Sequence, residues 1–162
     1  MISFDFKTYI DKFINKDFYT SLFNRKEEVY QKFLSSSMIG WTKVIDEELI
    51  SDILTTRDKI KSNSSVLVVI GIGGSYLGSY ALSQMFSKYF TSDNFEVVYA
   101  GYNLSSKYLS ELVDYLKDKD FFVNVISKSG TPLEITLAYQ ALLTLMKEKY
   151  TDEEIKNRII IT

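Results

Sequence analysis

The chain has 162 residues, 46% of them hydrophobic, with a formal net charge of −2 and neither histidine nor cysteine. This length and hydrophobic share suit one folded domain with a real core, and the scattered basic residues argue against a nucleic-acid partner. Without cysteine there is no disulfide framework or thiolate metal site, and without histidine no imidazole carries protons within the chain. The N-terminus lacks a signal-peptide pattern and no apolar run is long enough for a membrane span, so we expect a soluble, cytoplasmic protein with no membrane partner.

The first sixty residues show the periodicity of helices. Val29, Phe33 and Leu34 fall at helical spacing, and residues 46–61 resume the pattern before a serine-rich loop at 61–65. We therefore expect residues 1–61 to form an N-terminal helical extension that packs on an α/β core formed by residues 62–162.

From residue 66 onward the pattern alternates between strand and helix, which predicts a doubly wound α/β fold with a parallel sheet. Pro132 suits the first turn of a helix, and residues 151–154 match a capping box. The predicted strands are 66–70, 95–100, 121–126 and 158–162, and the predicted helices are 75–90, 105–116 and 132–149. Because a parallel strand normally feeds a further loop and helix, we expect the domain to be truncated at its C-terminus.

A glycine-rich loop, GIGGSYLG at residues 71–78, follows the first predicted strand. It matches neither the dinucleotide fingerprint, because Tyr76 stands where the third glycine belongs, nor the phosphate loop of nucleotide hydrolases, because Ser79 replaces the lysine. Three glycines and a hydroxyl at a helix start favour ligand binding. The alternative is a turn that lets the helix pack close to its strand.

The third predicted strand ends in a second polar loop, SKSGT at residues 127–131. Three hydroxyls, a glycine and an ammonium can donate to several phosphate oxygens, and the helix dipole favours an anion there. A single hydroxyl would suffice to cap the helix, so three exceed that need. Glu134, one turn further on, could be a supporting carboxylate, although charges at helix starts usually serve the dipole.

The expected topology brings the two loops together. In the strand order 2-1-3-4, strands one and three are neighbours and their crossover helices lie on opposite faces of the sheet. A crevice opens at this switch point. We therefore predict that a phosphorylated ligand is held between the two loops.

At these loops the chain resembles the glucose-6-phosphate isomerase family. The resembling segments are 71–78 and 125–131, joined by Asn103-Leu104-Ser105-Ser106 and the Gly40-Trp41 pair. The resemblance implies an N-terminal sugar isomerase (SIS) domain with a sheet of flavodoxin-like order, preceded by helices. It spans essentially this whole chain but only the first part of the longer family sequence.

The resemblance also implies the roles of individual residues. Gly74 and Ser75 would touch the sugar, and the phosphate loop would consist of Ser127, Lys128, Ser129, Gly130 and Thr131. Pro132 departs from the family, which commonly has a second threonine there, and this removes a hydroxyl and a backbone N–H.

The family's reaction is aldose–ketose isomerisation through an enediol, in which a glutamate moves the proton while histidine and lysine assist ring opening. Those residues lie later in the family sequence, so we expect no catalytic residue in this chain, and no metal or cofactor. The substrate would be a sugar phosphate, glucose 6-phosphate, in glycolysis and gluconeogenesis, and the full-length protein would be a homodimer or higher homo-oligomer. The alternative is a non-catalytic SIS module that senses sugar phosphates.

Overall fold

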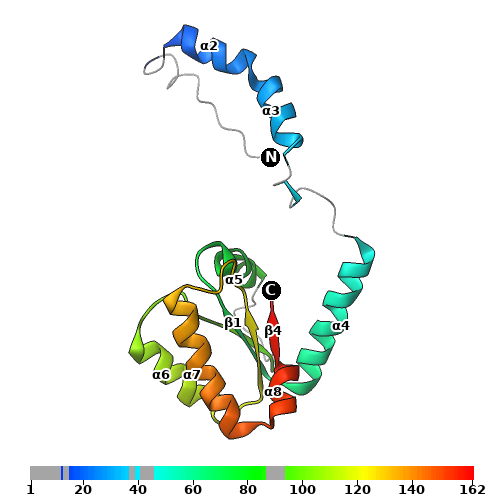
Figure 1. The fold of residues 1–162 in the computed structure, drawn as a ribbon, viewed down its shortest axis with the longest axis vertical. Helices are drawn as coiled ribbons and strands as arrows, with labels where there is room; N and C mark the ends of the chain where they lie inside the picture. The colour runs from blue at the N-terminus through cyan, green and yellow to red at the C-terminus, as the bar shows by residue number, and fades with distance from the viewer. Residues whose placement is uncertain (1–11, 13–14, 37–38, 41–45, 87–93) are drawn as a thin grey trace. The chain divides into compact units, whose positions relative to one another are not determined.

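The computed structural model describes residues 12, 15–36, 39–40, 46–86 and 94–162 (Figure 1). The chain divides into two compact units, Met1–Leu49 and Ile50–Thr162. Trp41, one of the resembling residues, lies outside the described part of the chain, as do residues 87–90 of the predicted helix 75–90.

The first unit contains two short amphipathic helices, α2 (Lys16–Asn24) and α3 (Lys26–Leu34). The side chain of Asn15 caps α2 by accepting hydrogen bonds from the backbone N–H groups of Asp17 and Phe18. Neither helix has a buried residue, and their large hydrophobic side chains lie open to solvent. The helical prediction for this region is therefore confirmed where the structure describes it.

A four-stranded parallel sheet forms the centre of the second unit, in the order β2-β1-β3-β4. This is the predicted strand order, and every pair is parallel. The strands are β1 (Val66–Ile70), β2 (Glu96–Ala100), β3 (Phe121–Val125) and β4 (Ile159–Ile161). β4 is shorter than predicted because Arg158 still belongs to the preceding helix.

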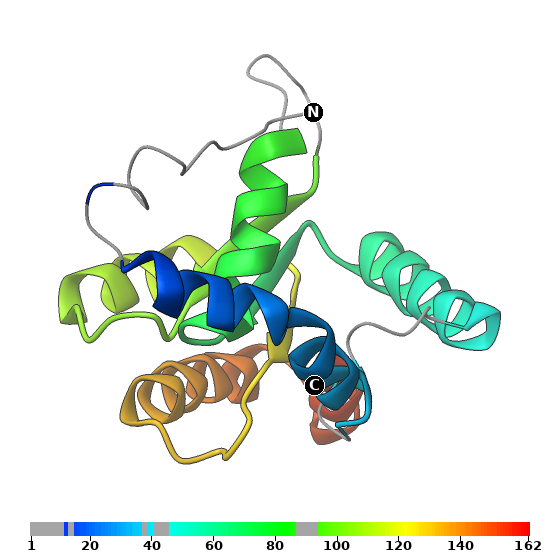
Figure 2. The same cartoon turned by 90° about the horizontal axis from the view of Figure 1, so that it is seen from above.

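Helices cover both faces of the sheet (Figure 2). Alternate residues of β1 pack with α6 (Ser106–Leu116), α7 (Leu133–Lys149) and α8 (Asp152–Arg158) in a core that includes Phe121, Leu142 and Met146. On the opposite face, rings of α5 (Gly74–Phe86) contact Tyr99 of β2, and α4 (Glu47–Asn63) lies beside β1 and β3. The helices that follow β1 and β3 therefore lie on opposite faces, as predicted.

Local sequence signals explain where several of these helices begin. Thr151 and Glu154 form the predicted capping box at the start of α8, each bonding to the other's backbone N–H. Ser105 caps α6 by accepting from the backbone N–H of Tyr108. Among the described residues, no helix is both long and apolar enough to cross a bilayer.

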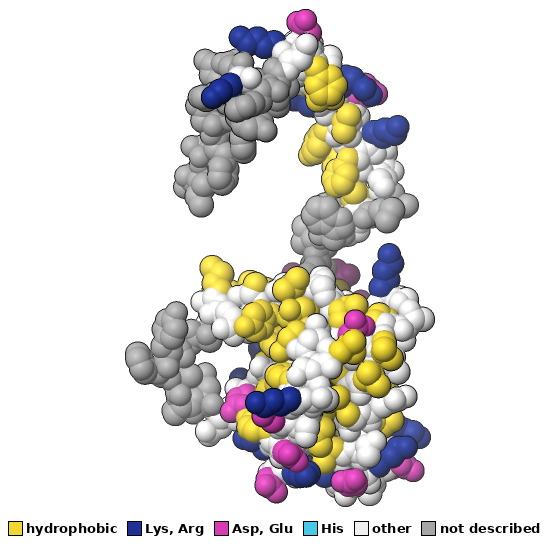
Figure 3. Space-filling view, turned by 90° about the vertical axis from the view of Figure 1, so that its left-hand side faces the viewer, with side chains coloured by type: hydrophobic (Ala, Val, Ile, Leu, Met, Phe, Trp, Pro, Cys, Tyr) yellow, Lys and Arg dark blue, Asp and Glu magenta, His cyan; other side chains and the backbone are white. Residues whose placement is uncertain are grey.

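Hydrophobic side chains remain exposed at the end of the unit where the strands terminate. Leu77, Leu104 and Leu133, which follow β1, β2 and β3, are more than half exposed, at 52%, 59% and 58%. Figure 3 shows yellow side chains spread over the upper part of this unit, with most of the visible charges lower down.

We expect the free edge of β4 to promote self-association. Within the described residues β4 pairs only with β3, and Ile161 is 81% exposed, so unpaired backbone groups stand beside an apolar side chain. Ile160 is half-buried against α4, so Ile161 is the residue to change. Ile161→Lys should reduce self-association in sedimentation velocity at high concentration. Leu82→Lys, on exposed α5, is the control, and a purely monomeric unmodified chain would contradict the expectation.

Candidate functional site

The glycines of the first loop serve different purposes. A side chain at Gly71 would come within 3.1 Å of the Cβ of Ser75, so Gly71 allows the close packing of strand and helix. Gly73 has a φ of 51°, a left-handed conformation that favours glycine. A Cβ at Gly74 or Gly78 would meet nothing within 4 Å. Packing and backbone conformation thus account for Gly71 and Gly73, and leave the backbone of Gly74 open to a ligand.

The second loop is held in shape by bonds among its own hydroxyls. Ser127 Oγ accepts from the backbone N–H of Gly130 at 3.0 Å, and Ser129 Oγ lies 2.8 Å from Thr131 Oγ1. Gly130 has a φ of 69°, which lets the chain turn back toward Thr131. Residues 128–131 are exposed and Ser127 is half-buried, so the loop forms a small polar surface above the end of β3.

None of these hydroxyls caps α7. The N-cap residue is Pro132, which makes no side-chain hydrogen bond to the helix, and the helix begins at Leu133. The prediction that Pro132 lies in the first turn of the helix is therefore wrong by one position. The alternative role of the loop as a simple helix cap fails as well, and the N-terminal end of a 17-residue helix carries no side-chain cap.

The sheet brings the two loops to neighbouring strand ends. Ile70 of β1 is in register with Val125 of β3, and the backbone N–H of Ile126 donates to the carbonyl of Ile70 at 2.9 Å. The first loop then begins at Gly71, after β1, and the second begins at Ser127, after β3. Two helix N-termini, of α5 and α7, therefore begin beside one switch point, where the positive ends of their dipoles favour an anion.

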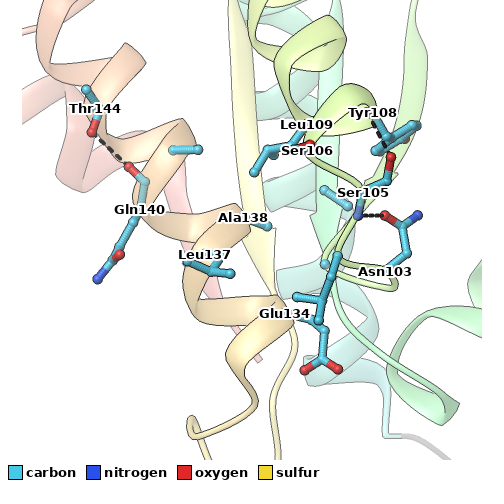
Figure 4. A pocket seen from close by; sticks show the side chains of 14 residues that line it. Asn103, Ser105, Ser106, Tyr108, Leu109, Glu134, Leu137, Ala138, Gln140 and Thr144 are labelled. Atoms are coloured by element: carbon cyan, nitrogen blue, oxygen red, sulfur yellow. Dashed lines mark hydrogen bonds between the residues drawn. The ribbon is translucent and has the colours of Figure 1, made fainter.

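A hollow of about 390 Å³ lies between the β2–α6 loop and α7 (Figure 4). Its walls are mostly apolar. At the start of α6, Asn103 Oδ1 accepts from the backbone N–H of Ser105, and Ser105 Oγ accepts from that of Tyr108. Glu134, in the first turn of α7, lines the hollow and is labelled at its lower end in Figure 4. None of the loop residues predicted to bind the ligand lines this hollow.

Glu134 is the residue whose place the sequence left most open. The sequence predicts it one turn into the helix after the second loop, whereas it is the second residue of α7 and lines the hollow. One sequence signal pointed to this place: the segment from Asn103 to Ser106, which resembles the isomerase family, lines the same hollow.

Comparison with known proteins gives sequence relatives over part of their length. The chain is 48% identical over 132 residues to glucose-6-phosphate isomerase of Staphylococcus aureus (strain Newman), and equally to that of Staphylococcus haemolyticus (strain JCSC1435). Each alignment covers 78% of this chain and 30% of the relative, so the chain spans about a third of the length of these relatives. No family model matches the chain.

Two solved structures share the fold. A hypothetical protein from Thermus thermophilus aligns with a TM-score of 0.61 and 24% identity, over 85% of this chain and 32% of that one. A glucose-6-phosphate isomerase from Chlamydia trachomatis aligns with a TM-score of 0.53 and 23% identity, over 75% of this chain and 25% of that one. At these identities the structures show a common fold, and the relation to the isomerases rests on the sequence.

Proposed function

We propose that this chain, which is homologous to part of glucose-6-phosphate isomerase, supplies the phosphate- and sugar-binding loops of such an enzyme. The full-length protein would interconvert glucose 6-phosphate and fructose 6-phosphate in glycolysis and gluconeogenesis. The observation that carries the proposal is the 48% identity, together with two polar loops at the neighbouring ends of β1 and β3.

The second loop would hold the phosphate. The Ser129 and Thr131 hydroxyls, which bond to one another here, can rotate to donate to phosphate oxygens. The Lys128 ammonium and the uncapped start of α7 add positive charge at the same place. A charged acceptor makes each such hydrogen bond stronger than one between neutral groups, so the loop can retain a dianion at an exposed site.

The first loop would contact the sugar. Because Gly74 has no side chain, a ring hydroxyl can approach its backbone, and Ser75 is half-buried at the start of α5. The support for this role is that the first and second loops leave the neighbouring strands β1 and β3 at the same end. One end of the ligand is then fixed by charge and the other by hydrogen bonds, which orients the sugar relative to groups outside this chain.

Proton transfer between C1 and C2 requires a base, which the resemblance places in the later part of the longer sequence. Within these 162 residues there is no histidine. We therefore assign no catalytic residue to this chain. Substrate, reaction and homo-oligomeric assembly of the full-length protein belong to the same proposal.

The packing of residues 1–61 on the α/β core also remains a proposal. Its support is that α2 and α3 expose Phe18, Phe23 and Tyr30, at 60%, 52% and 54%, and that α5 exposes Met85 at 74%. Amphipathic helices of this kind are normally stabilised by burying such faces.

A second candidate, a module that senses sugar phosphates without chemistry, would use the same two loops. Its support is the same pair of polar loops at the ends of β1 and β3, which would bind a sugar phosphate in either protein. The two candidates differ in the protein that surrounds the module, so an intact gene product with isomerase turnover would exclude the sensor.

The phosphate loop gives the direct binding test. Ser127→Ala and Thr131→Ala should each weaken glucose 6-phosphate binding by about 1–3 kcal/mol, because each hydroxyl would donate to a charged group. Binding of glucose should change far less. Isothermal titration calorimetry measures both ligands, with Thr144→Ala, at the far end of α7, as the matched control. Equal losses for glucose and glucose 6-phosphate would show that these hydroxyls do not contact the phosphate.

A further inference from the structure

Five tyrosines pack together at the edge of the sheet next to the first loop. Tyr76 and Tyr80 come from α5, Tyr99 from β2, Tyr102 from the β2–α6 loop and Tyr108 from α6. We call these residues the tyrosine cluster. The ring of Tyr76 stacks on Tyr102, with centroids 5.1 Å apart and planes at 23°, and Tyr102 meets the edge of Tyr108 at 5.6 Å.

Tyr99 of β2 links Tyr108 of α6 to the tyrosines of α5. The Tyr108 hydroxyl donates to the backbone carbonyl of Tyr99 at 2.5 Å, and the Tyr99 ring lies 6.1 Å from Tyr76 and 5.3 Å from Tyr80. Burial, helped by a hydrogen bond with Tyr102, raises the pKa of Tyr108 to about 12. The raised pKa reflects how far this hydroxyl is withdrawn from solvent into the cluster.

The cluster adjoins the first loop directly. Tyr76 follows Ser75, and Tyr102 precedes Asn103, so the stacked pair joins the first turn of α5 to the β2–α6 loop. α5 has no fully buried residue, and its Leu77 is 52% exposed. Ring contacts of Tyr76 and Tyr80 with Tyr99, together with the close packing of Ser75 on Gly71, hold the start of α5 against the sheet.

We propose that Tyr76 and Tyr102 are positioning residues, whose stacked rings fix Gly74 and Ser75 at the distance from the phosphate loop that a sugar phosphate requires. The inference rests on the proposed function and deepens it. The phosphate loop follows β3 and is held in shape by bonds among its own hydroxyls, so its geometry does not rest on the cluster. Binding of the sugar depends on where the first turn of α5 lies, and the stack sets that position.

The test uses the whole 162-residue chain and two probes, glucose 6-phosphate and inorganic phosphate, in titration calorimetry. Tyr102→Ala should raise the Kd for glucose 6-phosphate about two- to tenfold, the range that one aromatic pair is worth. The Kd for inorganic phosphate should stay within about twofold. Tyr102→Phe, which keeps the ring, should bind both probes as the unmodified chain does.

Tyr115→Ala is the matched control, because Tyr115 is exposed to the same extent as Tyr102, at 38%, and lies outside the cluster. It should leave both Kd values unchanged. Hydrogen exchange gives an independent readout: the amides of Ser75, Tyr76 and Leu77 should exchange faster in Tyr102→Ala, and those of Gly130 and Thr131 should not. Tyr102→Leu, which keeps much of the volume without a ring, serves the same measurements if the alanine variant does not fold.

The possible failures are distinguishable. If the unmodified chain binds glucose 6-phosphate and Tyr102→Ala binds it equally well, the positioning role is overturned while the proposed function stands. If the variant weakens both probes alike, the cluster supports the fold in general and the inference is also overturned. If the unmodified chain binds inorganic phosphate but gains nothing from the sugar, the proposed function falls and takes this inference with it.

Discussion

Assayed alone, the 162-residue chain should leave glucose 6-phosphate essentially unconverted. The loops described here would grip and orient the ligand, but none of the residues assigned to them moves a proton between two carbons. Loss of a general base by itself lowers a rate about a hundred- to ten-thousand-fold. A coupled assay that follows formation of fructose 6-phosphate measures this directly.

The comparison for that assay is an intact glucose-6-phosphate isomerase at equal concentration, such as the relative from Staphylococcus aureus (strain Newman). Binding should be measured on the same samples, since a chain that binds the sugar phosphate without converting it supports the division of labour proposed above. Turnover close to that of the intact enzyme would show that a base lies within these residues.

Leu142→Ala should lower the free energy of unfolding by about 2–5 kcal/mol. Leu142 is completely buried on α7 and belongs to the core that joins this helix to β1, β3 and α6. Removing its side chain loses apolar burial and leaves a space that rigid strands cannot fill by moving. Urea unfolding followed by circular dichroism gives the change as a shift in midpoint at constant slope.

Leu137→Ala is the matched control for this substitution, because it makes the same chemical change on the same helix at a residue that is 42% exposed. Its cost should be a small fraction of that at Leu142. Similar losses at both positions would mean that α7 does not pack on the sheet through the face described here.

The order of the helices and strands along the chain, and the order of the strands in the sheet, could be predicted from the sequence. Apolar runs such as residues 66–70 are typical of strands buried on both faces of a parallel sheet, and the switch point follows from the order of the crossovers. Boundaries were less secure. Arg158 continues α8 for one residue into the predicted strand, and Pro132 stands just outside α7, because a proline fits both the N-cap and the first turn.

Other features depend on packing between elements far apart in the chain, which no local pattern records. Gly101 was not singled out by the sequence, yet its φ is 77° and a Cβ there would lie 2.8 Å from Cγ2 of Ile70. The tyrosine cluster is of the same kind, since its members come from α5, β2, a loop and α6. The binding roles of Ser127 to Thr131 stay predictions that the titrations described above will test.

The position of β1 in the sheet has a consequence for synthesis of the protein on the ribosome. Val66 pairs with Glu96 on one side and with Phe121 on the other, and both partners are synthesised after it. At translation rates of about 5–20 residues per second, this apolar strand waits several seconds for its second neighbour. Contacts so distant along the chain also slow the conformational search. During that interval the apolar segment from Val66 to Ile70 lacks one of the two strands that cover its edges in the folded unit.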